Sequence, residues 1–236
     1  MSLVLGYHLF LYFNNIFSFS GKIAPISVSS HAIINLGVHE SAACRVLIKE
    51  NLEKISQAVL SHRNSRNPYI QHALLALLPR LAAFDCAHFV KENLTITMNY
   101  LLTTLRGRDA DRGSAFVALG FMAVAVGTEI CPFLPRVWEV IRGVLPSRDT
   151  PSKKRGIPEP TVFACISLVG HAVGWAIGED AKDLLEPMFA TGLTLALTTA
   201  LRELALCVPQ LKKDISNGLL RMLSQVLTKK YFLQIF

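Results

Sequence analysis

Hydrophobic positions recur every three or four residues along most of the chain after Ser41. One such set is formed by Val90, Leu94, Met98, Leu101 and Leu105. Comparable sets lie within 132–146 and 210–228. This spacing gathers the apolar side chains on one face of a helix and leaves the other face polar. The pattern therefore predicts amphipathic helices, and the period-two alternation of half-buried strands is nearly absent.

A second kind of segment is apolar on almost every side and alternates with the amphipathic kind. The predicted pairs are 69–84 with 88–106, 112–127 with 132–146, 160–178 with 180–192, and 194–208 with 210–228. A helix that is apolar all round has to be covered on most sides, whereas an amphipathic helix needs cover on one. The alternation thus predicts four helical hairpins, each made of one buried and one half-exposed helix.

The hairpins recur at a regular interval. Ala76, Ala118, Cys165 and Ala200 occupy equivalent positions in the buried helices, at intervals of 42, 47 and 35 residues. Periods of about 40–47 residues are typical of HEAT and armadillo repeats. We therefore predict an all-α protein, an α-solenoid of HEAT/armadillo-like helical hairpins. The expected solenoid covers 41–230, with a leading helix before the four hairpins. Residues 1–40 form an unassigned, poorly ordered N-terminal segment in this prediction, and 231–236 an unassigned tail.

The composition is compatible with this prediction and argues against one class of partner, nucleic acid. The chain has 236 residues, of which 51% are hydrophobic, and that is ample for a core. Its net charge of +7 would permit binding to nucleic acid, but the basic residues are scattered in ones and twos. We therefore expect no nucleic-acid partner. The five cysteines lack a metal-binding spacing, so we expect reduced thiols.

A membrane protein is an alternative because the mean hydropathy is high, at +0.39. Its spans would be 1–19 and 161–178. The second has roughly the needed length but contains His171 and three glycines. The first begins without a basic region and has no clear cleavage site, so it is a poor signal peptide. We expect no stable membrane span.

The sequence lacks the common catalytic motifs. It contains no glycine-rich nucleotide-binding loop, no zinc-protease motif, no nucleophile elbow and no kinase catalytic loop. His171 lies on the most apolar segment, where a hydrogen-bonded core histidine is expected rather than a ligand. The sequence therefore predicts no catalytic residues, no cofactor-binding residues, no cofactor and no metal site.

At the residues that form the repeats, the chain resembles a known family. The stretch RNSRNPYIQHALLALLPRLAAF (63–84) looks like part of the N-terminal HEAT-repeat region of the target-of-rapamycin (TOR) serine/threonine kinases. Further matching stretches are 112–149, 160–174 and 183–227. The resemblance covers roughly 41–230, includes loop residues such as 209–214, and stops abruptly at both ends.

The resemblance implies a scaffold role without catalysis, because the kinase domain of the family has no counterpart in this sequence. It implies protein partners, namely the rest of a TOR kinase chain and adaptors such as Raptor or Rictor. The expected function is assembly of a TOR complex in nutrient and growth signalling. The expected location is cytoplasmic, with association to endomembranes through the parent complex.

Interface residues are predicted only from residue type. Trp and Arg are enriched at interface hot spots, which makes Trp138, Arg142, Arg202 and Arg221 the candidates for protein interaction. The competing interpretation is ordinary packing for Trp138 and solvation for the three arginines. An alternative function also stays open, in which the chain is a self-standing solenoid adaptor that binds a peptide along its surface.

Overall fold

The computed structural model describes residues 49–107, 109–146 and 160–232. These residues belong to one compact unit that begins at Lys49. They form helices joined by turns, and no strand occurs among them, which confirms the all-α prediction. The predicted segment 1–40, most of the tail 231–236 and the loop 147–159 lie outside the described residues.

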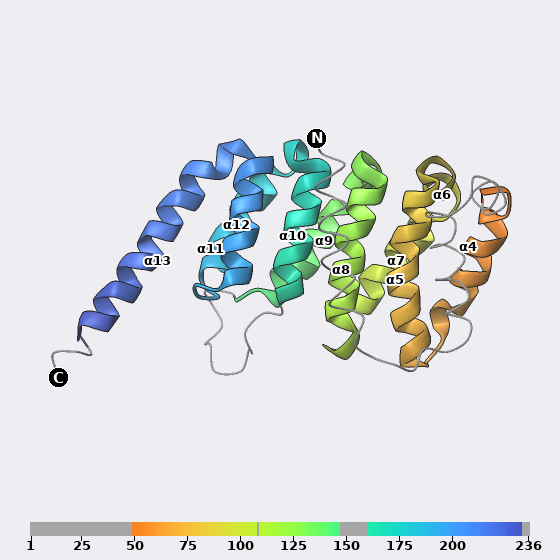
Figure 1. Ribbon diagram of the computed structural model, residues 1–236, viewed down its shortest axis with the longest axis horizontal. Coiled ribbons are helices and arrows are strands. Elements are labelled where there is room, and N and C mark those ends of the chain that lie inside the picture. Colours follow the sequence, from red (N-terminus) through yellow and green to blue (C-terminus); the bar gives the residue numbers. More distant parts are fainter. Residues whose placement is uncertain (1–48, 108, 147–159, 233–236) are drawn as a thin grey trace, which may run out of the picture. The chain divides into compact units, whose positions relative to one another are not determined.

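One row of helices forms the interior of this unit. Its members are α5 (Pro68–Phe84), α8 (Asp109–Val126), α10 (Pro160–Val173) and α12 (Leu195–Cys207). Each packs against the next in chain order, and Figure 1 shows them side by side. They correspond to the four segments predicted to be buried, and we call them the first row.

A second row lies along the first. Its members are α7 (Leu94–Leu105), α9 (Leu134–Val144), α11 (Gly178–Phe189) and α13 (Lys212–Phe232). Neighbours in this row also contact each other in chain order. The repeated stacking of hairpins is the α-solenoid that the sequence predicted.

Shorter elements join or precede the rows. The helix α4 (Leu52–Ser61) and the 3₁₀ turn η1 (His62–Asn64) come before α5, and α6 (Cys86–Glu92) follows it. The turn η2 (Gly127–Phe133) joins α8 to α9, η3 (Gly174–Ala176) joins α10 to α11, and η4 (Pro209–Leu211) joins α12 to α13. These connections are short, which keeps consecutive helices antiparallel neighbours.

Close packing within the first row depends on a missing side chain. The centre of α8 is fully buried from Ala115 to Gly120 and packs on α5 and α10. A Cβ atom added at Gly120 would lie 2.7 Å from Cδ1 of Leu168 and 3.3 Å from Cα of Cys165. Only glycine therefore allows α8 and α10 to approach this closely.

Local sequence signals explain where several helices begin. Asn67 caps α5, since its Oδ1 accepts a hydrogen bond from the Tyr69 amide at 2.9 Å, and Pro68 occupies the first turn. Asp85 caps α6 through the His88 amide, and Thr194 caps α12 through the Leu197 amide. These caps supply partners for first-turn amides that have none within the helix.

Some predicted helix bounds were wrong. The segment 88–106 is two helices, α6 and α7, separated at Asn93, and α6 turns by 119° from α5. The segment 160–178 ends as an α-helix at Val173 and continues as η3. The helix α12 is less covered than predicted, because it packs on α10 and α13 but has no further first-row neighbour among the described helices.

Candidate functional site

Trp138, the aromatic interface candidate, lies on α9 and is fully buried, with 0% of its surface exposed. Its indole Nε1 has no hydrogen-bond partner among the described residues. Tryptophan at such a site contributes a large apolar surface to packing. Trp138 thus packs in the interior of this chain, and its role at an interface stays a prediction that requires it to become exposed.

Two of the arginine candidates join helices of the second row. Nη2 of Arg142 on α9 lies 3.1 Å from Oδ1 of Asp180 and 4.0 Å from Oδ2 of Asp183, both on α11. Nη2 of Arg221 on α13 lies 2.6 Å from Oε1 of Glu186 on α11. Each of these arginines therefore bridges one helix to its neighbour in the row.

The same kind of bridge joins the first two helices of that row. Nη2 of Arg106, directly after α7, lies 2.9 Å from Oε2 of Glu139 on α9. Nη1 of Arg136 on α9 donates to Oδ1 of Asn99 on α7 at 2.9 Å. Every neighbouring pair in the second row is thus linked by an arginine. These links could not be predicted from the sequence, because the partners are 33 to 38 residues apart.

These bridges are exposed, which limits their energy. Side-chain exposure is 43% for Arg142 and 51% for both Arg106 and Arg221. Exposed ion pairs contribute about 0–1 kcal/mol each, because water and salt screen the charges. The arginine bridges therefore contribute little to the stability of the fold.

Arg202, the fourth candidate, lies on α12 and is the most exposed of the three arginines, at 73% of its side chain. Its Nε and Nη2 donate to Oε1 of the adjacent Glu203 at 3.1 and 2.8 Å. The guanidinium thus holds the Glu203 carboxylate in place, and Glu203 itself is buried.

Glu203 is the end of a linked group of side chains that we call the Cys207 cluster: His171, Glu203 and Cys207. Nε2 of His171 on α10 lies 3.1 Å from Oε2 of Glu203, and Nδ1 of His171 lies 3.2 Å from Sγ of Cys207. A carboxylate can only accept hydrogen bonds, so the hydrogen resides on Nε2 in neutral His171. Nδ1 is then the acceptor, and the Cys207 thiol donates to it.

The environment keeps Cys207 protonated until a base acts. Burial and then the Glu203 carboxylate raise the pKa of the Cys207 thiol above its usual value. The expectation of a core histidine was half right. His171 is hydrogen-bonded, but 32% of its side chain is exposed, so solvent reaches the cluster. The Cys207 cluster could not be predicted from the sequence, because the spacing of its three residues matches no known motif.

The sequence also missed several exposed apolar side chains, of which Trp175 and Leu206 are two. Trp175 in η3 is 75% exposed and Leu206 on α12 is 68% exposed. Both belong to segments predicted to be buried, and they became exposed because α10 ends early and one side of α12 is open. Trp175, rather than Trp138, is the tryptophan that a partner protein can reach.

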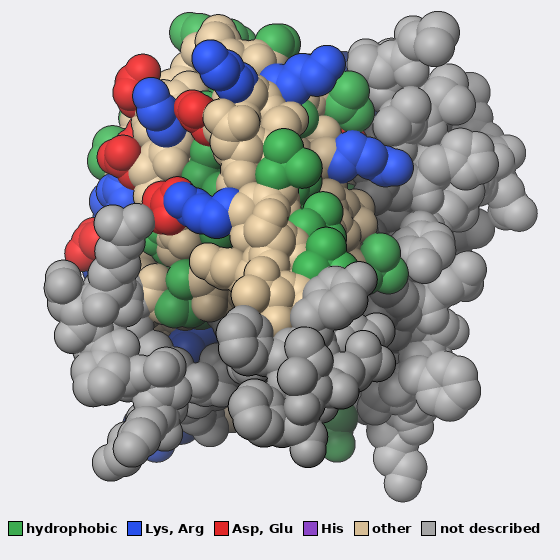
Figure 2. All heavy atoms as spheres, turned by 90° about the vertical axis from the view of Figure 1, so that its left-hand side faces the viewer, with side chains coloured by type: hydrophobic (Ala, Val, Ile, Leu, Met, Phe, Trp, Pro, Cys, Tyr) green, Lys and Arg blue, Asp and Glu red, His purple; other side chains and the backbone are tan. Residues whose placement is uncertain are grey.

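A row of apolar side chains is exposed on α13. Its members, which we call the α13 row, are Leu220, Leu223, Val226 and Leu227. Figure 2 views the chain from its α13 side and shows hydrophobic side chains at the surface among basic and acidic ones. The members of the α13 row are spaced so that they lie on one face of the helix, and the row is therefore continuous along it.

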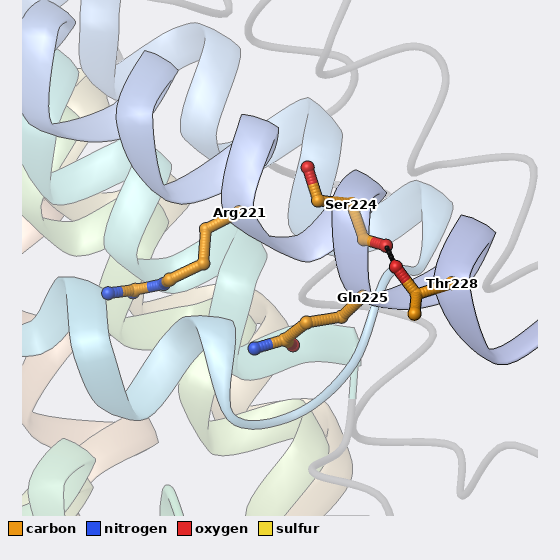
Figure 3. Close-up of a pocket in the computed structure, with 4 residues that line it drawn as sticks. All are labelled: Arg221, Ser224, Gln225 and Thr228. Carbon is orange, nitrogen blue, oxygen red and sulfur yellow. Dashed lines mark hydrogen bonds between the residues drawn. The ribbon is translucent and has the colours of Figure 1, made fainter.

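Two surface depressions differ in their lining. The first is lined by Arg221, Ser224, Gln225 and Thr228, all from α13, and Figure 3 shows Arg221 and Gln225 extending in the same direction. The Thr228 hydroxyl donates to the Ser224 carbonyl at 2.8 Å. All four side chains come from one exposed helix, and we assign no site to this depression.

The second depression is a polar groove of about 400 Å³. Amide and hydroxyl side chains dominate its lining: Asn64, Gln71, Asn99, Tyr100, Thr103 and Thr104, together with Arg63, Ile96, Gly107 and Asp111. Burial raises the pKa of Tyr100 to about 12, so its hydroxyl stays neutral. The groove brings residues of η1, α5, α7 and α8 together, and its surface combines uncharged hydrogen-bonding groups with apolar atoms.

In the part of the chain that the structure describes, no group of three His, Cys, Asp or Glu residues is placed to hold a metal ion. One continuous segment there, Asp111–Val144, is long and apolar enough to cross a membrane, and the bent pair α5 and α6 would be a second. Half of the most apolar stretch of Asp111–Val144 is buried against the rest of the protein. The segment Pro160–Ala176, which contains most of one span of the membrane alternative, is apolar but shorter.

The fold and surface define a class: an α-solenoid whose hairpins are joined by arginine bridges. No family model matches the sequence. Individual proteins do match. The chain is 47% identical over 193 residues, or 82% of its length, to the serine/threonine-protein kinase mTor of Drosophila melanogaster. It is 33% identical over 181 residues to the serine/threonine-protein kinase TOR of Arabidopsis thaliana, and 32% over 185 residues to tor1 of Schizosaccharomyces pombe.

The chain is therefore homologous to the TOR serine/threonine kinases, as the sequence resemblance indicated. It spans only 7–8% of the length of these relatives.

Proposed function

We propose that this chain is a non-catalytic, HEAT-type scaffold segment of a TOR serine/threonine kinase. The observation that carries the proposal is the 47% identity over 193 residues to 8% of the length of a TOR kinase. The stacked hairpins support it, since solenoids present extended surfaces to partner proteins. Its role is assembly of a TOR complex in nutrient and growth signalling, in the cytoplasm and on endomembranes that the complex joins.

The α13 row supports a continuous array in the parent kinase. It is an exposed apolar face on the last described helix of the second row, and the relatives extend far beyond the matched region. A further helical hairpin would cover it as α13 itself covers α11. The isolated chain should then self-associate through this face, because exposed apolar rows associate in water.

This point is tested by replacing Leu220 and Leu227 with Lys and measuring mass by analytical ultracentrifugation. We expect the unaltered chain to associate and the double variant to sediment as a monomer with unchanged helical circular dichroism. Thr228→Lys, on the same helix, is the matched control and should leave association unchanged. A monomeric unaltered chain would contradict this use of the α13 row.

The proposed partners are the adaptors Raptor or Rictor. The surfaces that support them are the exposed Trp175 and Arg202, which are residue types favoured at hot spots. The purified chain should bind at least one purified adaptor in biolayer interferometry. Trp175→Ala or Arg202→Ala should weaken that binding roughly tenfold, which corresponds to about 1.4 kcal/mol of binding free energy.

Lys91→Ala is the control for this experiment. Lys91 on α6 is 82% exposed and pairs with the neighbouring Glu92, so its loss removes an exposed charge without touching either row. We expect its affinity for the adaptor to be unchanged. Absence of binding to both adaptors would refute the partner proposal while leaving the homology to TOR kinases intact.

The polar groove favours a second function, a self-standing adaptor for an extended peptide. Its amide and hydroxyl side chains match the hydrogen-bonding groups of a peptide backbone. A peptide library displayed against the purified chain distinguishes the two functions. Binders that Asn64→Ala or Thr103→Ala abolish would support the adaptor, and a library without such binders would eliminate it.

A further inference from the structure

We infer that Cys207 is a site of thiol–disulfide exchange with a low-molecular-weight disulfide, and that His171 is its base. The inference is independent of the scaffold role, because it rests on the Cys207 cluster alone. Its residues come from α10 and α12, which Figure 1 shows side by side. A thiol hydrogen-bonded to an imidazole, which is in turn held by a carboxylate, is the arrangement that activates cysteine nucleophiles.

Each member of the cluster has a defined part. The Cys207 thiol donates to Nδ1 of His171 over 3.2 Å, so the proton has a short path to the base. Glu203 accepts from Nε2 over 3.1 Å and stabilises the imidazolium that forms when the proton moves. Arg202 holds the opposite oxygen of Glu203, which keeps the carboxylate directed at His171.

The small disulfide is the oxidant, and the exchange needs no other. As the proton passes to Nδ1, the Cys207 sulfur attacks one sulfur of the small disulfide and forms a mixed disulfide. The old sulfur–sulfur bond breaks, its electron pair leaves with the second sulfur, and that thiolate takes the proton from imidazolium. The small disulfide is reduced to one free thiol, and Cys207 is oxidised within the new bond.

The raised pKa of Cys207 is compatible with this role. It means that the thiol is protonated near neutral pH and depends on a base. A thiol of higher pKa is also a stronger nucleophile once the proton is removed, since nucleophilicity increases with thiol pKa. Access is open, because Cys207 is half-buried rather than buried and part of the His171 ring is exposed.

Two other cysteines in the chain provide comparison. Cys86 is also half-buried, and burial followed by Glu129 and Asp85 raises its pKa. It therefore matches Cys207 in exposure and in the cause of its shift, but no hydrogen bond from it to an imidazole occurs among the described residues. Cys165 is fully buried and burial raises its pKa to about 12, so it should be inert.

The experiment treats the purified full chain with oxidised glutathione near neutral pH and follows each cysteine by peptide mass spectrometry. We expect the Cys207 mixed disulfide to form at least roughly tenfold faster than that of Cys86, because a positioned base accelerates removal of the thiol proton. His171→Gln keeps a polar side chain but removes the base, and it should bring the two rates together. Cys207→Ser confirms the assignment of the modified peptide.

The comparison within one molecule makes the result decisive even if a variant folds poorly. Equal rates at Cys207 and Cys86 in the unaltered chain would refute the inference without any substitution. A persistent advantage of Cys207 in a folded His171→Gln chain would show that exposure, not the base, controls its rate. Cys131, another half-buried cysteine, lies in η2, and an unchanged rate there in the His171→Gln chain would indicate that the fold is intact.

Discussion

Gly120 is the residue at which the spacing of the first row is most tightly set. An alanine there would place its Cβ 2.7 Å from Cδ1 of Leu168. We predict that Gly120→Ala lowers the free energy of unfolding by about 1–3 kcal/mol, because α8 and α10 must separate. Gly143 on α9 has open space around it, so Gly143→Ala should raise stability by up to about 1 kcal/mol through lower backbone entropy. Urea unfolding of both variants tests the pair, and equal effects would contradict it.

The two tryptophans should differ sharply when removed. Trp138 is fully buried, and Trp138→Ala should cost about 3–5 kcal/mol by leaving a large cavity. Trp175 is 75% exposed, and Trp175→Ala should change stability by less than about 0.5 kcal/mol. Thermal melts of the two variants measure this difference. A stability loss of less than about 1 kcal/mol for Trp138→Ala would contradict the buried position of Trp138 and favour its role as an accessible interface residue.

At the scale of elements, the arginine bridges connect helices of the second row without adding much stability. A double-mutant cycle of Arg142→Ala and Asp180→Ala should give a coupling energy below about 1 kcal/mol, because both side chains are over 40% exposed. The coupling should decrease further at high salt, since salt screens exposed charges. A coupling that exceeds this and resists salt would mean that the bridge is shielded from solvent.

The predicted helices can be compared with the observed ones at their ends. Eight helical segments were placed from apolar spacing, and capping residues such as Asn67 and Thr194 explain where two of them begin. The break at Asn93 was missed, because Val90 and Leu94 continue the same apolar spacing across it. The chain also bends by 119° between α5 and α6. The spacing of apolar residues predicts which face of a helix is buried, but it does not predict such a change of direction.

At the scale of the whole molecule, a stack of repeats is stabilised by contacts between neighbours. The helices α8 and α10 each have first-row neighbours on both sides, whereas the side of α13 that bears the α13 row is exposed. We predict that amide hydrogen exchange is slowest in α8 and α10 and fastest in the last turns of α13. Peptide-resolved mass spectrometry measures this order. Uniform protection along the chain would indicate a single cooperative unit instead.

The sequence by itself determined the helical class, the alternation of buried and half-exposed helices and the relation to TOR kinases. Apolar periodicity and sequence similarity to relatives can both be read from the order of residues along the chain, without knowledge of which segments meet in space. Only the tertiary structure decided that Trp138 is buried, that Trp175 is exposed and that His171 meets Glu203 and Cys207. Glu203 and Cys207 are 32 and 36 residues from His171 along the chain, and only the packing of α10 on α12 brings them within hydrogen-bonding distance of it.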